Sequence, residues 1–205
     1  MLLYNTKGRN LVFDGDSFFD QYVGSPVVVG GQYIPTGAYN NIISGRKIAT
    51  TRFGTSGDTI VSSITNFSAT TGSVIRSGDV VVFECVTNDL GTNGSTAAQA
   101  YADLTTYCGL VHAAGAKVVV CTMTARDKVG DPGDIETQRL AYNASVVANA
   151  GGIADAICDV GADPMFDTQA DCANATNYNA DKLHLTTAGQ DNYITLLSAT
   201  LTSFL

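Results

Sequence analysis

Catalysis by a serine nucleophile requires a base and a partner that orients the base, and the candidates for these roles in this chain are Ser17, His184 and Asp181. A serine hydroxyl is a weak nucleophile until a base takes its proton, and the chain has two histidines that can be that base. His184 follows Asp181 by three residues in a segment whose composition is typical of a loop, so the carboxylate can turn back and orient the imidazole. The pattern predicts Ser17 as nucleophile, His184 as base and Asp181 as the partner of the base.

The surroundings of Ser17 suit a nucleophile. Gly15-Asp16-Ser17 follows the apolar run Leu11-Val12-Phe13 and precedes a predicted helix opening at residues 17–20. The first amides of a helix have no intrahelical acceptor, and the positive end of the helix dipole favours developing negative charge. We therefore expect Ser17 to lie on a strand-to-helix turn and to supply both the attacking oxygen and an oxyanion-binding amide.

His112 is the other histidine. It falls near the end of a predicted helix over residues 96–114, where a C-terminal imidazole is common because it interacts favourably with the helix dipole. We expect a structural or solvent-facing role for His112.

With two further motifs, these residues resemble the four signature blocks of the SGNH hydrolase superfamily, also called the GDSL esterases and lipases. The blocks lie between residues 11 and 189, at Gly15-Asp16-Ser17, Ser56-Gly57-Asp58, Thr87-Asn88-Asp89 and Asp181-Lys182-Leu183-His184. The resemblance implies Ser17, Asp181 and His184 as the catalytic triad, with Gly57 and Asn88 in the oxyanion hole. Two positions depart from the family pattern. Phe18 replaces the usual leucine, and Val86 replaces the glycine that commonly opens the third block, where a branched side chain is expected to reshape the acyl pocket.

The physical properties of Gly57 and Asn88 agree with those roles. Asn88 follows a strand-like run over residues 79–85, and an amide side chain is one of the donors that can hold an oxyanion. Gly57 has no Cβ, so a substrate oxygen can approach its amide closely. Taken singly, Gly57 is also typical of a plain turn, Asn88 of a loop cap and Asp181 of a surface charge. Their joint occurrence in this order favours one shared site.

The hydrophobic pattern predicts an α/β fold: a single domain over residues 1–205 with a doubly wound parallel sheet in a flavodoxin-like three-layer α/β/α arrangement. Strands are expected near residues 11–14, 47–51, 80–85, 117–122 and 156–160, and helices near residues 59–65, 96–112, 135–150 and 188–204. The first three blocks each follow a predicted strand, which places them at the carboxyl edge of the sheet. The stretch 22–45, rich in Gly, Pro, Tyr and Asn, is interpreted as a long connection that forms part of the substrate rim.

Charge and hydropathy restrict the partners. The chain has 11 Lys+Arg against 19 Asp+Glu, a net charge of −8, and no Lys/Arg run, which disfavours nucleic acid and anionic membranes. The sequence shows neither a signal peptide nor a run of about 18 apolar residues, so no spanning helix is expected. A cytoplasmic location, association with a virion and secretion after processing all agree with this pattern. The sequence does not address the oligomeric state.

Five cysteines match no metal motif by their spacing. Cys85, Cys121 and Cys158 lie in predicted core strands, and Cys108 lies on a predicted helix. Cys172 is the one thiol expected in a loop, available to react or pair.

These features predict a serine hydrolase that cleaves carboxylic esters through an acyl-enzyme, with no metal or organic cofactor. The preferred substrate is a small-molecule or carbohydrate ester with an acetyl or other short acyl group. One alternative is a lipolytic esterase or thioesterase for longer chains. Another is a non-catalytic carbohydrate-binding or virion structural module, which would not need nucleophile, base and orienter together.

Overall fold

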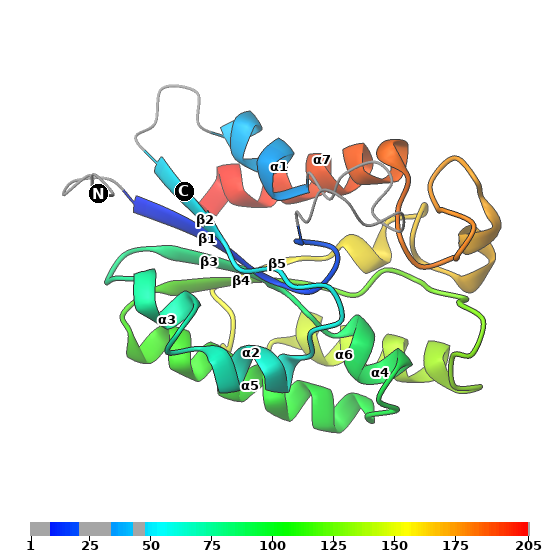
Figure 1. Ribbon diagram of the computed structural model, residues 1–205, viewed down its shortest axis with the longest axis horizontal. Coiled ribbons are helices and arrows are strands. Elements are labelled where there is room, and N and C mark those ends of the chain that lie inside the picture. The colour runs from blue at the N-terminus through cyan, green and yellow to red at the C-terminus, as the bar shows by residue number, and fades with distance from the viewer. Residues whose placement is uncertain (1–8, 21–33, 43–47, 205) are drawn as a thin grey trace.

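A parallel sheet forms the centre of the molecule. The computed structural model describes residues 9–20, 34–42 and 48–204 (Figure 1). Its five strands run in the order β2 (Ile48–Arg52), β1 (Arg9–Gly15), β3 (Val80–Glu84), β4 (Lys117–Cys121) and β5 (Ala156–Cys158), with every neighbouring pair parallel. The predicted α/β class with a doubly wound parallel sheet is confirmed.

Helices cover both faces of the sheet (Figure 1). The first face carries α1 (Ile34–Ile42) and α7 (Thr187–Phe204), and the second carries α2 (Ile60–Asn66), α3 (Thr71–Val74), α4 (Thr87–Gly91), α5 (Ala97–Ala113) and α6 (Ile135–Ala148). Two apolar clusters fill the layers between the sheet and the helices. The central strand β3 is buried along its whole length, which explains why it reads as a continuous apolar run rather than an alternating one.

Polar residues define where two of the long helices begin. Thr96 caps α5 through a capping box with Gln99, in which each side chain bonds the backbone amide of the other residue. At α7 the Thr186 hydroxyl accepts a hydrogen bond from the Gly189 amide at 3.2 Å. The start of α7 matters for the site, because the helix begins three residues after His184.

The structure corrects the interpretation of the stretch 22–45. Residues 34–42 form helix α1, which packs against α7, while residues 22–33 and 43–45 lie outside the described residues. Proline, glycine and two asparagines within α1 gave this segment the composition of a loop, so burial against α7 outweighed its weak helix propensity. The short helices α3 and α4 were also missing from the prediction.

The predicted helix opening at Ser17 is a turn in the described residues. The amides of Phe19 and Asp20 donate to the Asp16 carbonyl at 3.1 and 2.9 Å. The chain beyond Asp20 lies outside the described residues until Ile34.

All five cysteines are free and buried. This corrects the expectation for Cys172, which lies in the 3-10 helix Gln169–Ala173 and packs into the core beside α7. Burial raises the pKa of the Cys172 thiol to about 12. A thiol in that state is neither exposed nor ionised enough to react readily.

Within the residues that the structure describes, no helix combines the length and the apolar character that a membrane span requires.

Candidate active site

The structure brings Ser17, His184 and Asp181 into one hydrogen-bonded chain. Ser17 Oγ lies 2.9 Å from His184 Nε2, and His184 Nδ1 lies 2.6 Å from Asp181 Oδ2. The imidazole therefore uses one nitrogen for the hydroxyl and the other for the carboxylate. This is the geometry in which a histidine removes the serine proton while the carboxylate fixes its tautomer.

Two groups of residues meet at this chain. We call Ser17, Gly57 and Asn88 the strand-end half, because they follow β1, β2 and β3. We call Asp181 and His184 the loop half, because they lie in the irregular segment before α7.

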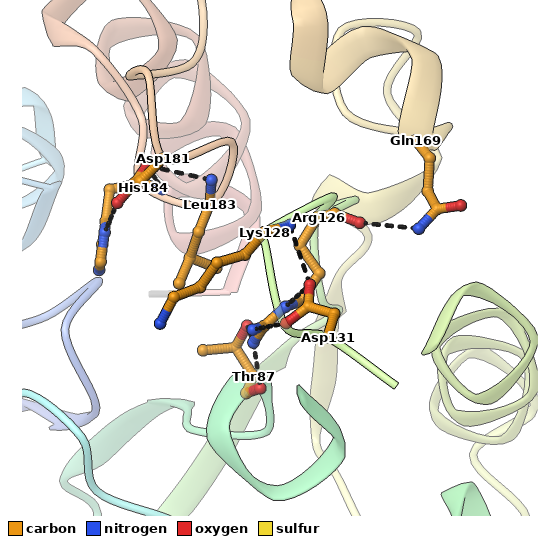
Figure 2. A network of polar contacts seen from close by, with 8 residues as sticks. All are labelled: Thr87, Arg126, Lys128, Asp131, Gln169, Asp181, Leu183 and His184. Carbon is orange, nitrogen blue, oxygen red and sulfur yellow. Dashed lines mark hydrogen bonds and ion pairs between the residues drawn. The ribbon is translucent and has the colours of Figure 1, made fainter. Parts of the chain in front are cut away.

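Asp181 organises the loop half through its own side chain. Its Oδ1 accepts hydrogen bonds from the backbone amides of Leu183 at 3.1 Å and His184 at 3.0 Å, while Oδ2 contacts the imidazole (Figure 2). Partial burial alone would raise the pKa of Asp181, but these hydrogen bonds outweigh it and hold the pKa below its usual value. Asp181 is therefore a carboxylate at neutral pH, as an orienting partner of histidine must be.

Lys182 gives this loop its tight shape. Its φ of +55° lies in the left-handed region, which a lysine adopts only when its surroundings impose it. Asn179 supports the same loop, since its carbonyl accepts from the Lys182 amide at 2.9 Å and its amide donates to the His184 carbonyl at 2.8 Å.

Backbone hydrogen bonds join the three segments of the strand-end half. The Thr55 amide donates to the Gly15 carbonyl at 3.0 Å, and the Asp16 amide donates to the Glu84 carbonyl at 3.2 Å. The Asp20 carboxylate also accepts from the Ser56 amide at 2.9 Å. The parallel sheet and these crosslinks fix the positions of Ser17, Gly57 and Asn88.

The strand-end half offers hydrogen-bond donors. Within the described part of the chain, no group accepts a hydrogen bond from the amides of Ser17 or Gly57. Asn88 Nδ2 donates to the Asp58 carbonyl at 2.9 Å and to Asp16 Oδ2 at 3.3 Å. The bond to Asp16 is the longer of the two, so a substrate oxygen can replace it more easily than the bond to Asp58.

Gly57 has φ +87°, and a Cβ built on it would meet no atom within 4 Å. The backbone conformation therefore requires glycine, while the space beside it is open.

Carboxyl groups lie buried behind the strand-end half. Asp16 and Glu84 are hydrogen-bonded to each other, and burial raises the pKa of both, with the neighbouring charge adding to the rise for Glu84. Asp16 also accepts hydrogen bonds from the amides of Phe18 and Asn88, which favour its charged form. Burial also raises the pKa of Asp89 to about 7, although its carboxylate accepts the Ile60 amide at the start of α2.

The structure also places three further residues that the sequence analysis singled out. His112 is on α5 and pairs with Asp155 at 2.9 Å, in agreement with a structural role. Val86 is buried in the apolar cluster beneath α2 and α4, so its branched side chain contributes to the core. Phe18 packs beside the imidazole, with ring centroids 6.2 Å apart.

Sequence reasoning missed Arg126, a fully buried cation next to the site (Figure 2). Its guanidinium binds the Asp131 carboxylate and the first residue of α4. A charged residue in a loop with no motif around it gave no signal of burial. The neighbouring Asp127 and the following Asp131 were the available hints of an ion pair.

A serine–histidine–aspartate chain at the carboxyl edge of a parallel α/β sheet is one of the arrangements found in serine hydrolases. The profile of the GDSL-like lipase/acylhydrolase family matches residues 13–191, and the chain belongs to this family of ester-hydrolysing enzymes. No curated protein sequence matches the chain.

Solved structures share the fold at low sequence identity. A lipase/acylhydrolase from Enterococcus faecalis is 20% identical with a TM-score of 0.69, and the alignment covers 96% of this chain and 97% of that one. The esterase EstA from Pseudoalteromonas, inhibited by monoethylphosphonate, is 15% identical with a TM-score of 0.68, covering 96% and 98%. Axe2, an acetyl-xylooligosaccharide esterase from Geobacillus, is 16% identical with a TM-score of 0.69, covering 95% and 94%.

Proposed function

We propose that this protein is a serine esterase that hydrolyses short-chain carboxylic esters, preferably acetyl esters on a carbohydrate, through an acyl-enzyme. The observation that carries the proposal is the Ser17–His184–Asp181 chain, with contacts of 2.9 and 2.6 Å. A binding module has no need for a nucleophile, a base and an orienting carboxylate in hydrogen-bonding contact.

In the first half-reaction, Ser17 Oγ attacks the ester carbonyl and forms a carbon–oxygen bond while His184 Nε2 takes the hydroxyl proton. The carbonyl oxygen becomes an oxyanion, held by the amides of Ser17 and Gly57 and by the Asn88 side chain. The bond to the alcohol then breaks, and the imidazolium returns its proton to that leaving oxygen.

In the second half-reaction, water attacks the acyl-enzyme and His184 accepts a proton from it. The second tetrahedral oxyanion collapses, the acid leaves, and the proton returns to Ser17. Asp181 stays ionised throughout and stabilises the imidazolium in both steps, which agrees with its lowered pKa.

The size of the acyl group is the finer part of the proposal. Support comes from the compact chain and from the fold shared with the acetyl-xylooligosaccharide esterase Axe2. The buried Phe18 beside the imidazole adds bulk next to the reacting serine, which suits a small acyl group.

A chain-length series of p-nitrophenyl esters from acetate to palmitate, run beside an acetylated polysaccharide, tests the proposal. We expect the highest kcat/KM with acetate and release of acetate from the polysaccharide. A maximum at long chains would support a lipolytic esterase instead. No turnover of any ester, together with no labelling of Ser17 by a fluorophosphonate, would support a binding module.

A further inference from the structure

Arg126 occupies an unusual position for a charged residue, because its side chain is only 1% exposed. It lies in the irregular segment that follows β4, nine residues before α6 begins at Ile135. Its Nε donates to Asp131 Oδ2 at 2.9 Å, and Nη2 bonds the other oxygen of the same carboxylate. Two parallel bonds to one carboxylate hold the guanidinium in a fixed plane.

The remaining side of the guanidinium faces α4. Nη1 donates to the Thr87 carbonyl at 2.5 Å and contacts Thr87 Oγ1 at 3.1 Å (Figure 2). The Thr87 carbonyl belongs to the peptide group whose amide is that of Asn88. Arg126 therefore restrains the backbone immediately before the side chain assigned to the oxyanion.

The contact between Arg126 and α4 leaves no space for another side chain. A Cβ on Gly91, at the end of α4, would overlap the Arg126 guanidinium. The guanidinium cannot move aside without leaving Asp131 or Thr87. The absence of a side chain at Gly91 thus lets Arg126 approach α4.

The same segment is also fastened to the loop half. The Asp127 amide donates to the Lys182 carbonyl at 3.0 Å, and Lys182 Nζ donates to Asp127 Oδ2 at 2.6 Å. The ion pair is partly exposed and contributes little by itself, but the backbone bond holds the left-handed residue between Asp181 and His184. Arg126 therefore contacts the Thr87–Asn88 peptide, and the adjacent Asp127 contacts the loop that carries His184.

Further bonds make this segment rigid although it has no regular structure. The Tyr178 hydroxyl donates to the Ala125 carbonyl at 3.0 Å, and Gln169 Nε2 donates to the Arg126 carbonyl at 3.1 Å. The Ala125 amide donates to the Phe166 carbonyl at 2.8 Å. A segment held in this way can transmit position between the elements it touches.

We propose that Arg126 is a positioning residue that sets Asn88 against the His184 loop, so that the oxyanion donor and the base reach the same carbonyl group. This inference rests on the proposed function, because it needs Asn88 to act on the substrate. Arg126 touches neither substrate nor triad and acts through the Thr87–Asn88 peptide.

A double-mutant cycle between Arg126 and Asn88 tests the proposal. kcat and KM for p-nitrophenyl acetate are measured for Arg126→Gln, Asn88→Ala and the double variant, with thermal midpoints for each. We expect Arg126→Gln to lower kcat by roughly 10- to 100-fold with KM nearly unchanged, because displaced donors lose transition-state binding. In the Asn88→Ala background the same change should lower kcat by less than about threefold, because the donor it positions is already absent.

Arg139 supplies the matched control. It is also fully buried, and its hydrogen bonds go to Glu136, to the Met123 carbonyl and to the Asp167 carbonyl. Arg139→Gln should therefore lower the thermal midpoint without a coupling to Asn88. If Arg126→Gln does not fold, Arg126→Lys takes its place in the cycle, since lysine keeps the charge opposite Asp131 but lacks the fork that reaches Thr87.

The kinetic results distinguish a failure of the positioning role of Arg126 from a failure of the proposed function. If Ser17→Ala and Asn88→Ala keep full activity, the proposed function fails. If both lose activity but the Arg126 change lowers kcat by the same factor in both backgrounds, the positioning role is overturned and Arg126 acts only on stability. An equal coupling of Arg139→Gln to Asn88 would overturn it as well.

Discussion

Ser17, Gly57 and Asn88 follow the ends of three neighbouring parallel strands, whereas Asp181 and His184 lie on a loop that belongs to no strand. In the strand-end half, sheet register and backbone crosslinks place the groups. In the loop half, one carboxylate accepts three hydrogen bonds and so places both itself and the imidazole. Sheet topology therefore positions one half of the site, whereas local hydrogen bonds centred on the Asp181 side chain position the other.

The carboxyl groups of the two halves also respond to pH in opposite ways. Burial favours the neutral form behind the strand ends, where the pKa of Asp89 is raised to about 7 and that of Asp14 to about 6. Hydrogen bonds favour the charged form of Asp181, whose pKa is lowered despite partial burial. The stability from the raised groups is lost as pH rises, and that from Asp181 is lost as pH falls.

The strongest test of the division between halves is whether they act as one unit in catalysis. Ser17→Ala should lower kcat by about 10⁴- to 10⁶-fold, and adding His184→Ala should cost little more, since neither group works without the other. Steady-state kinetics and fluorophosphonate labelling measure this. His112→Ala is the control and should keep full rate. Labelling at a serine other than Ser17 would contradict the assignment.

The second-largest loss of activity should follow from removing the Asp181 carboxylate, which shapes the loop half. Asp181→Asn should lower kcat by roughly 10³- to 10⁴-fold, because the amide favours the wrong imidazole tautomer and no longer stabilises imidazolium. Steady-state kinetics with p-nitrophenyl acetate measure this loss. Unimpaired kcat in Asp181→Asn would show that Asp181 does not orient His184 in solution.

Removing one oxyanion donor from the strand-end half should lower kcat by less, because the amides of Ser17 and Gly57 remain. Asn88→Ala should lower kcat by about 10²- to 10³-fold with a smaller change in KM, because the lost bond strengthens as charge develops. Michaelis–Menten constants for p-nitrophenyl acetate provide the measurement. An equal loss confined to KM would place Asn88 in ground-state binding.

Two substitutions of Gly57 distinguish an effect on backbone conformation from steric blocking of the site. The positive φ makes Gly57→Ala strained at about 1 kcal/mol or more, with roughly a tenfold loss of kcat as the amide shifts. Gly57→Val should lose more, because its larger side chain extends into the space that the substrate needs. Thermal melts and kcat for both variants decide this, and unimpaired turnover by Gly57→Val would remove Gly57 from the site.

The smallest effect on activity is expected for Asp89→Asn, which should instead change how the free energy of unfolding depends on pH. The pKa of Asp89 rises from 3.8 to about 7, so the folded state binds more protons between those values and loses stability as pH increases. At about 1.4 kcal/mol per pKa unit, Asp89→Asn should remove up to about 4 kcal/mol of the difference between pH 4 and pH 8. Urea unfolding at both pH values measures it, and an unchanged difference would show that Asp89 is ionised when folded.

The sequence predicted the five strands and the helices α2, α5, α6 and α7 because each has a distinct apolar pattern. Strand ends then followed within one or two residues, as for β3 at Val80–Glu84. The helices it missed have other causes. α3 and α4 are too short to show a helical period, and α1 contains the glycine, proline and asparagines of a loop.

Within the site, the predictable residues were those whose spacing encodes a local structure. The three-residue offset from Asp181 to His184 anticipates the observed turn, in which Asp181 accepts the amide at that distance. The partners that come from burial were not predictable. Asp16 and Glu84 meet only because the neighbouring strands β1 and β3 end side by side, and Arg126 is enclosed between Asp131 and Thr87. No local pattern records that a charge will be enclosed.

The burial of all five thiols has a practical consequence for spectroscopy. A cysteine introduced on the surface would be the sole accessible target for a maleimide dye in the native protein. Val129 offers such a position, since it is 97% exposed and lies three residues after Arg126. A fluorophore at Val129→Cys would report, in real time and without removing any native cysteine, whether the segment between the two halves shifts when an ester enters the site.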